Sequence, residues 1–147
     1  MVEANGIRSN PLPITIVPSQ PGIFTLNQQG TGVVAALRQN QSAISNDNPA
    51  QAGEIITLFC TGLGAVTPAT PLDVPTPLTG LVRTANTVEV TVGGKKADVA
   101  FAGLTPGSIA LYQVNVTIPA GIAASNLVPV QISINGAVSN TVTVPLR

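Results

Sequence analysis

The chain of 147 residues contains no histidine, no tryptophan and a single cysteine, and charged residues make up only 8% of it. Without histidine or a second cysteine, a Cys/His zinc site and an intramolecular disulfide are both excluded. Six basic residues balance six acidic ones. This balance excludes an electrostatic nucleic-acid binder, because that class needs clustered lysine and arginine. No apolar run reaches the roughly 20 residues that a membrane-spanning helix requires.

What the chain does contain is typical of an all-β domain. Hydrophobic residues make up 44% of the sequence, which is too many for a disordered segment. Apolar residues recur at every second position through residues 88–92, 112–118 and 130–134, and turn formers separate these stretches. Asn135-Gly136 is a strong hairpin signal. The pattern predicts a Greek-key β-sandwich of seven to nine antiparallel strands.

The sequence offers no convincing catalytic or metal-binding constellation. The acidic residues are scattered, whereas general acid–base catalysis usually needs histidine or paired carboxylates. Cys60 has no histidine to activate it, so we interpret it as a small buried hydrophobe. Asn46-Asp47-Asn48 carries one charge only, which favours an Asx turn over a calcium site. We therefore expect neither an enzyme nor a cofactor or metal site.

One motif occurs twice in the chain, 130 positions apart. Residues 5–10 read Asn-Gly-Ile-Arg-Ser-Asn and residues 135–140 read Asn-Gly-Ala-Val-Ser-Asn. An alternating apolar stretch follows each copy: Leu12, Ile14 and Ile16 in the first, and Val142, Val144 and Leu146 in the second. The chain therefore begins with the kind of strand that also ends it. We expect this of one repeat in an array, or of a subunit that carries a spare strand.

Two interpretations of residues 11–17 stay open. In the first interpretation these residues form the domain's own first strand, which Pro11 and Pro13 confine to an edge of the sheet or to the first position of the strand. Alternatively, they leave their own body and pair with an edge of the next subunit, making Leu12, Ile14 and Ile16 a candidate assembly strand. Such a head-to-tail contact does not close on itself, so it would build a fibre. We accordingly divide the chain into an N-terminal strand segment, residues 1–20, and a sandwich domain, residues 21–147.

Residues 66–80 are the most unusual surface element. Because four prolines interrupt any strand pairing there, we expect an extended, polyproline-like loop. Loops of this length are often functional, although an ordinary covering loop is the alternative. The residues of this candidate interaction loop are Pro68, Pro71, Asp73, Pro75 and Pro77.

Four stretches of the chain belong together: residues 21–25 (Pro-Gly-Ile-Phe-Thr), 48–64 (Asn-Pro-Ala to Thr-Gly-Leu-Gly), 90–107 (Val-Thr-Val-Gly-Gly to Leu-Thr-Pro-Gly) and 111–119 (Leu-Tyr-Gln-Val-Asn-Val to Ile-Pro). In this order they resemble the Solibacter-type C-terminal domain of large secreted acidobacterial proteins, which is similar to IPT/TIG-type immunoglobulin-like modules, and they imply an immunoglobulin-like Greek-key β-sandwich. The resemblance covers about residues 11–147. It implies an extracellular immunoglobulin-like sandwich without a known enzymatic role, and it brings no catalytic residues to this chain.

We therefore expect a non-catalytic, extracellular structural or assembly module of a bacterial surface or secreted protein. Its expected partners are identical subunits or neighbouring modules of a tandem array. The alternative is a carbohydrate- or protein-binding adhesion module, against which stands the shortage of aromatic residues, 3% of the chain. Residues 2–20 lack the basic start and apolar core of a signal peptide. We expect that the signal was removed, or that it stood at the start of a longer parent chain.

Overall fold

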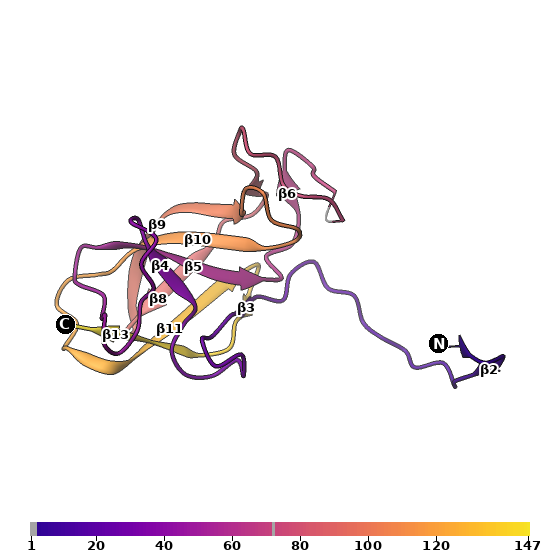
Figure 1. Ribbon diagram of the computed structural model, residues 1–147, viewed down its shortest axis with the longest axis horizontal. Helices are drawn as coiled ribbons and strands as arrows, with labels where there is room; N and C mark the ends of the chain where they lie inside the picture. Colours follow the sequence, from indigo (N-terminus) through magenta and orange to yellow (C-terminus); the bar gives the residue numbers. More distant parts are fainter. Residues whose placement is uncertain (1–2, 72) are drawn as a thin grey trace.

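The computed structural model describes residues 3–71 and 73–147 (Figure 1). All regular structure in these residues is β-strand, and every pair of named strands is antiparallel. This confirms the predicted all-β class and antiparallel pairing. The strands are β1 (Glu3–Ala4), β2 (Ile7–Arg8), β3 (Gly22–Ile23), β4 (Ala36–Arg38), β5 (Ile55–Thr61), β6 (Val66–Thr67), β7 (Arg83–Thr84), β8 (Glu89–Val92), β9 (Lys95–Leu104), β10 (Tyr112–Thr117), β11 (Ser125–Ile134), β12 (Ala137–Val138) and β13 (Val142–Leu146).

The thirteen strands in the described residues exceed the predicted seven to nine because many are very short. Six of them contain only two residues each: β1, β2, β3, β6, β7 and β12. These two-residue strands lie beside turns and loops. They are too short to show an alternating apolar pattern in the sequence. The longer strands lie where the alternation predicts them.

Two sheets share the long strand β9 (Figure 1). Its first residues, Lys95–Ala97, pair with β8 in the sheet that also contains β11, β12 and β13. From Asp98 onwards it pairs with β10 in the sheet that contains β3, β4, β5, β6 and β7. A register shift opposite Asn115 and Val116 marks a β-bulge in β9. Such bulges bend a strand, which allows β9 to pass from one sheet to the other.

The core consists of the apolar residues that alternate along these strands. The inward side chains of β10 and β11 are buried as the period-two pattern predicts. Strand β5 pairs with β10 along one edge and with β3 and β4 along the other, which confirms its predicted central position. Full burial of a valine, isoleucine or leucine side chain contributes roughly 1.5–3 kcal/mol, so this aliphatic core supplies most of the stability.

Strand β13 closes the body because it is held along both edges. It pairs antiparallel with β11 on one side. On the other side it runs parallel to residues 32–34, where the Val34 amide donates to the Thr143 carbonyl at 2.9 Å and the Thr143 amide donates to the Gly32 carbonyl at 2.8 Å. The Ala50 amide donates to the Pro145 carbonyl, also at 2.9 Å. We call residues 133–147, which include the last two residues of β11 together with β12 and β13, the closing segment.

Residues 3–17 project away from the rest of the molecule, and we call them the arm (Figure 1). None of the described residues forms a strand pair with residues 11–17. Residues 11–17 are therefore not the domain's own first strand, which corrects one of the two sequence interpretations. The remainder, residues 18–147, is the body.

The body begins slightly earlier than the predicted boundary at residue 21, because residues 18–20 already pack on it. Ser19 is buried, and the Gln20 amide donates to the Gly62 carbonyl at 2.9 Å. A Cβ atom on Gly62 would lie 1.9 Å from the Gln20 carbonyl oxygen, and one on Gly64 would lie 2.4 Å from that of Pro18. Only glycine permits this close approach, so residues 18–20 are fixed against the end of β5.

We expect Gly62→Ala to destabilise the body much more than Gly53→Ala. Both glycines have a positive φ, 74° and 79°. An alanine at either position is therefore destabilised by about 1–2 kcal/mol, because it must adopt a left-handed backbone conformation. Only Gly62 adds a backbone clash, because nothing lies within 4 Å of a Cβ on Gly53. Urea denaturation of the two variants measures the difference. Equal losses of unfolding free energy would show that residues 18–20 are not fixed here.

We also expect the thiol of Cys60 to be unreactive in the folded chain. The residue is fully buried, as predicted, and burial raises its pKa to about 12. Because the thiolate is the reacting form, raising the pH from about 7 to about 10 should leave labelling by an aromatic disulfide reagent slow. The urea-unfolded chain should label rapidly, with a rise near the ordinary thiol pKa of about 8.5. Fast labelling of the folded chain would contradict the buried placement.

Candidate assembly interface

The arm begins with a small hairpin of the same geometry as the hairpin in the closing segment. Asn5 and Gly6 have φ values of 52° and 76°, and Asn135 and Gly136 have 51° and 78°. Positive φ at both central residues is the hallmark of a type I′ turn, which Asn-Gly favours. The strand pairs also match: Glu3 pairs with Arg8 as Ser133 pairs with Val138. The repeated sequence therefore folds into the same local structure twice.

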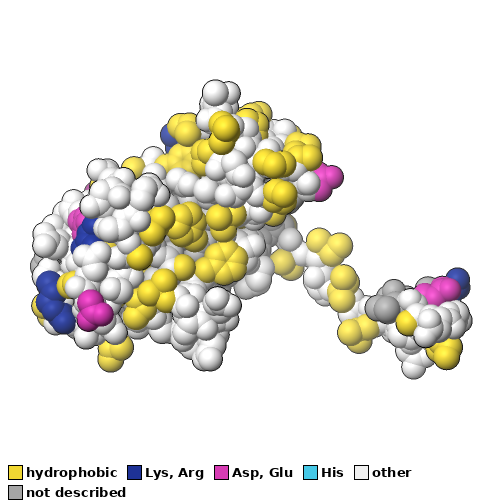
Figure 2. All heavy atoms as spheres, viewed as in Figure 1, with side chains coloured by type: hydrophobic (Ala, Val, Ile, Leu, Met, Phe, Trp, Pro, Cys, Tyr) yellow, Lys and Arg dark blue, Asp and Glu magenta, His cyan; other side chains and the backbone are white. Residues whose placement is uncertain are grey.

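After its hairpin the arm presents a row of large apolar side chains to solvent. Leu12 and Ile14 are each 79% exposed and Ile16 is 89% exposed. Figure 2 shows hydrophobic side chains along the whole length of this extension. Burying three such side chains would contribute roughly 5–9 kcal/mol in total. Exposed apolar rows of this size usually mark an interaction surface.

The corresponding residues of the closing segment are buried. Val142 and Val144 have no exposed surface and Leu146 is 2% exposed. The chain thus contains two copies of one alternating apolar strand. One copy is enclosed by the body and the other has no cover.

Asn140 fixes the closing segment to the opposite part of the body. Its side-chain oxygen accepts from the Ile23 amide at 2.7 Å, and its amide nitrogen donates to the carbonyls of Ile23 and Gly30 at 3.0 and 2.6 Å. Its counterpart in the arm, Asn10, is exposed. Sequence reasoning did not assign this role to Asn140, although the position was visible as the last residue of the repeated motif.

The proline-rich segment is a loop between two short strands. Val66–Thr67 pair with Arg83–Thr84 before the first proline, so the ladder reaches slightly into the predicted loop 66–80. Beyond it, Thr76 fixes the loop to a neighbouring turn: its amide and its hydroxyl both donate to the Ser108 carbonyl, at 2.9 and 3.0 Å. The five predicted interaction residues, Pro68, Pro71, Asp73, Pro75 and Pro77, are all exposed. The arm and this loop are separate features of the surface.

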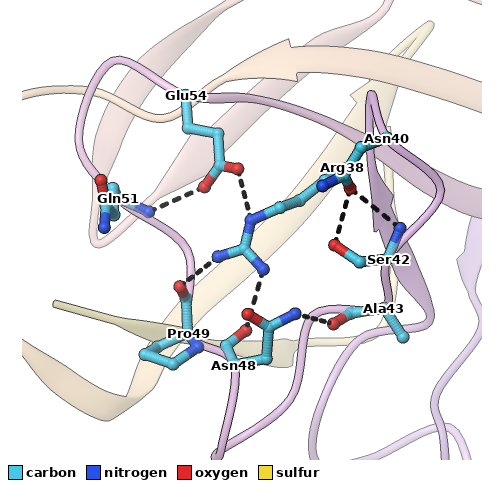
Figure 3. A network of polar contacts seen from close by, with 8 residues as sticks. All are labelled: Arg38, Asn40, Ser42, Ala43, Asn48, Pro49, Gln51 and Glu54. Carbon is cyan, nitrogen blue, oxygen red and sulfur yellow. Dashed lines mark hydrogen bonds and ion pairs between the residues drawn. The ribbon is translucent and has the colours of Figure 1, made fainter.

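A polar network in a shallow hollow holds the loop that follows β4 (Figure 3). The Arg38 guanidinium donates to Glu54 Oε1 and to the Pro49 carbonyl, both at 2.5 Å. The other carboxylate oxygen of Glu54 accepts from the Gln51 amide at 3.0 Å. Both oxygens of this carboxylate are therefore engaged in structure. The partly buried ion pair fixes residues 48–51 beside β4, which in turn positions Ala50 against β13.

The remaining acidic side chains do not converge on a site. Glu3 pairs with Arg8 at 2.8 Å and Glu89 pairs with Lys96 at 2.5 Å, both on the surface. In residues 3–71 and 73–147, no three His, Cys, Asp or Glu side chains lie close enough to hold a metal ion. The same residues contain no helix of the length and apolarity needed to cross a bilayer.

No protein-family model, curated protein or solved structure matches this chain.

We expect Asn140→Ala to destabilise the dilute chain by about 2–4 kcal/mol, because it removes three hydrogen bonds and leaves buried backbone groups of β3 without their partner. Asn10→Ala is the matched control. It should change stability by less than about 0.5 kcal/mol, since its side chain is exposed. Urea denaturation at low protein concentration measures both. A large loss for Asn10→Ala would mean that the arm packs on its own body.

Proposed function

We propose that the chain is a non-catalytic, extracellular structural module of a bacterial surface or secreted protein, and that it assembles with identical or neighbouring modules through its N-terminal arm. The observation that carries this proposal is the exposed, alternating row Leu12, Ile14 and Ile16. An extended strand with one apolar face binds a partner in two ways. Its backbone forms hydrogen bonds with the edge of the partner's sheet, and its apolar side chains fill pockets on the partner.

The position of the arm supports head-to-tail assembly. It leaves the body at the end opposite the C-terminus (Figure 1). A contact between unlike ends of two copies generates open strings rather than closed dimers. The low charge of the chain, 8%, leaves little electrostatic repulsion between successive bodies. The Solibacter-type and IPT/TIG-like resemblance, which implies an extracellular immunoglobulin-like module, fits this proposal.

The adhesion alternative receives less support from the surface. Sugar-binding modules usually present an aromatic platform. Here Phe101 and Tyr112 are buried, and Phe24, 44% exposed, is the most exposed of the four aromatic residues. The Tyr112 hydroxyl donates to the Gly64 carbonyl at 2.5 Å, so this hydroxyl is already engaged in a hydrogen bond within the body.

We expect the full chain to form concentration-dependent oligomers or filaments, and residues 18–147 alone to stay monomeric. Ile14→Asp should abolish association, because it places a charge within the apolar row. Pro11→Asp, which adds the same charge at a position whose counterpart in the second copy of the motif, Thr141, is exposed, should have a much smaller effect. Analytical ultracentrifugation and negative-stain microscopy measure the result. Association that persists without residues 1–17 would contradict the proposed role of the arm.

A further inference from the structure

We propose that the arm binds a second copy of this chain at one defined place: the slot between β11 and residues 32–34 that the closing segment occupies. Each arm residue of one copy would occupy the place that the residue 130 positions later occupies in the second copy. This inference rests on the proposed assembly role and specifies its partner and register. The partner copy releases its own residues 133–147 to admit the arm.

The first support is that the match between arm and closing segment extends to detail. Both hairpins have the same turn angles and the same pairing. The Ser9 hydroxyl donates to the Asn10 carbonyl at 3.2 Å, as the Ser139 hydroxyl donates to the Asn140 carbonyl at 2.8 Å. The hairpin of the arm therefore already has the conformation of the hairpin that it would replace, so the arm itself would need little reorganisation, and the main rearrangement is the release of residues 133–147 by the partner copy.

The second support is that the apolar side chains of the arm match three buried positions of the body in chemical type and spacing. Leu12, Ile14 and Ile16 would replace Val142, Val144 and Leu146, all of which are buried. The first two replacements add one methylene each, and the third exchanges isomers of equal volume. Pairing with an exposed sheet edge would supply backbone hydrogen bonds but no preformed pockets for these three side chains.

The third support is the position of the two prolines. In β13, Thr143 exchanges hydrogen bonds with residues 32–34, so in an alternating strand Val142 and Val144 direct their backbone groups towards β11. By the same count, Leu12 and Ile14 would face β11, whereas Pro11 and Pro13 would face away from it. The arm thus keeps every amide donor of residues 12–16 that the pairing with β11 uses.

Pro13 changes the other edge of the slot in two ways. It cannot donate the bond that the Thr143 amide gives to the Gly32 carbonyl at 2.8 Å. Proline also lacks the hydroxyl group of Thr143. That hydroxyl oxygen, Thr143 Oγ1, is buried and has no hydrogen-bond partner among the described residues. The loss of one bond is therefore accompanied by the removal of one unsatisfied polar atom.

A disulfide at an outward-facing position tests the register. Pro129 lies opposite Thr143 in β11, where Cα atoms of such a pair are about 4.5 Å apart, close enough for a disulfide. In a Cys60→Ala background, Pro13→Cys with Pro129→Cys should yield a ladder of disulfide-linked oligomers under mild oxidation. Thr143→Cys with Pro129→Cys should link within one chain, and Leu12→Cys with Pro129→Cys should not link.

Competition between the two strands tests the slot itself. Weakening the resident strand by Val142→Ala and Val144→Ala should raise the yield of linked oligomers several-fold, with folding checked by circular dichroism. Weakening the arm at the corresponding positions, Leu12→Ala and Ile14→Ala, should lower the yield several-fold. The arm variants cannot fail through misfolding of the body, because these residues lie outside it.

The outcomes separate this inference from the proposed function. Arm-dependent filaments without the 13–129 link, or a yield that does not respond to weakening the resident strand, would overturn the slot but leave assembly through the arm in place. Absence of both linkage and arm-dependent association, also in the variant with the weakened resident strand, would overturn both.

Discussion

The fold depends on one strand, β13, being held along both edges. Its antiparallel pairing with β11 belongs to one sheet, while its parallel hydrogen bonds to residues 32–34 and Ala50 attach the long loops of the other half. Asn140 at its start binds β3, and the Arg38–Glu54 pair keeps Ala50 within reach of its end. Each body therefore needs one closing segment, and the sequence of this chain repeats the pattern of that segment in the arm. The proposed assembly follows from that repeat.

Local alternation made much of the fold predictable from the sequence. The buried faces of β10 and β11, the central position of β5 and the burial of Cys60 all follow from period-two patterning or from hydrophobicity. The repeated motif drew attention to Leu12, Ile14 and Ile16 before any coordinates. What the pattern could not show is which partner each strand takes. Pro11 and Pro13 were compatible with an edge strand of the same body, and only the three-dimensional arrangement shows residues 11–17 unpaired in their own chain.

Contacts between residues far apart in the sequence were also beyond local reasoning. Nothing in the neighbourhood of Asn140 indicates that it binds Ile23 and Gly30, more than 100 positions earlier. The same holds for Gly62 and Gly64. In the sequence they look like ordinary turn residues, whereas the structure shows that residues 18–20 cross them at close range. This crossing fixes the point at which the arm leaves the body. If Val17 ends a strand in the neighbour, Pro18 follows without a spacer, so successive bodies would be joined by a short, rigid connection.

The two prolines of the arm have a further consequence for the solubility of a chain that exposes so apolar a strand. An ordinary extended segment offers amide donors along both edges, and two such edges let identical strands stack on one another without limit. Pro11 and Pro13 remove donors from one edge only. In the proposed assembly the arm would thus complete one sheet, while being a poor template for the next arm. This asymmetry would disfavour amyloid-like stacking of free arms and would leave the edge that pairs with β11 in the proposed assembly intact.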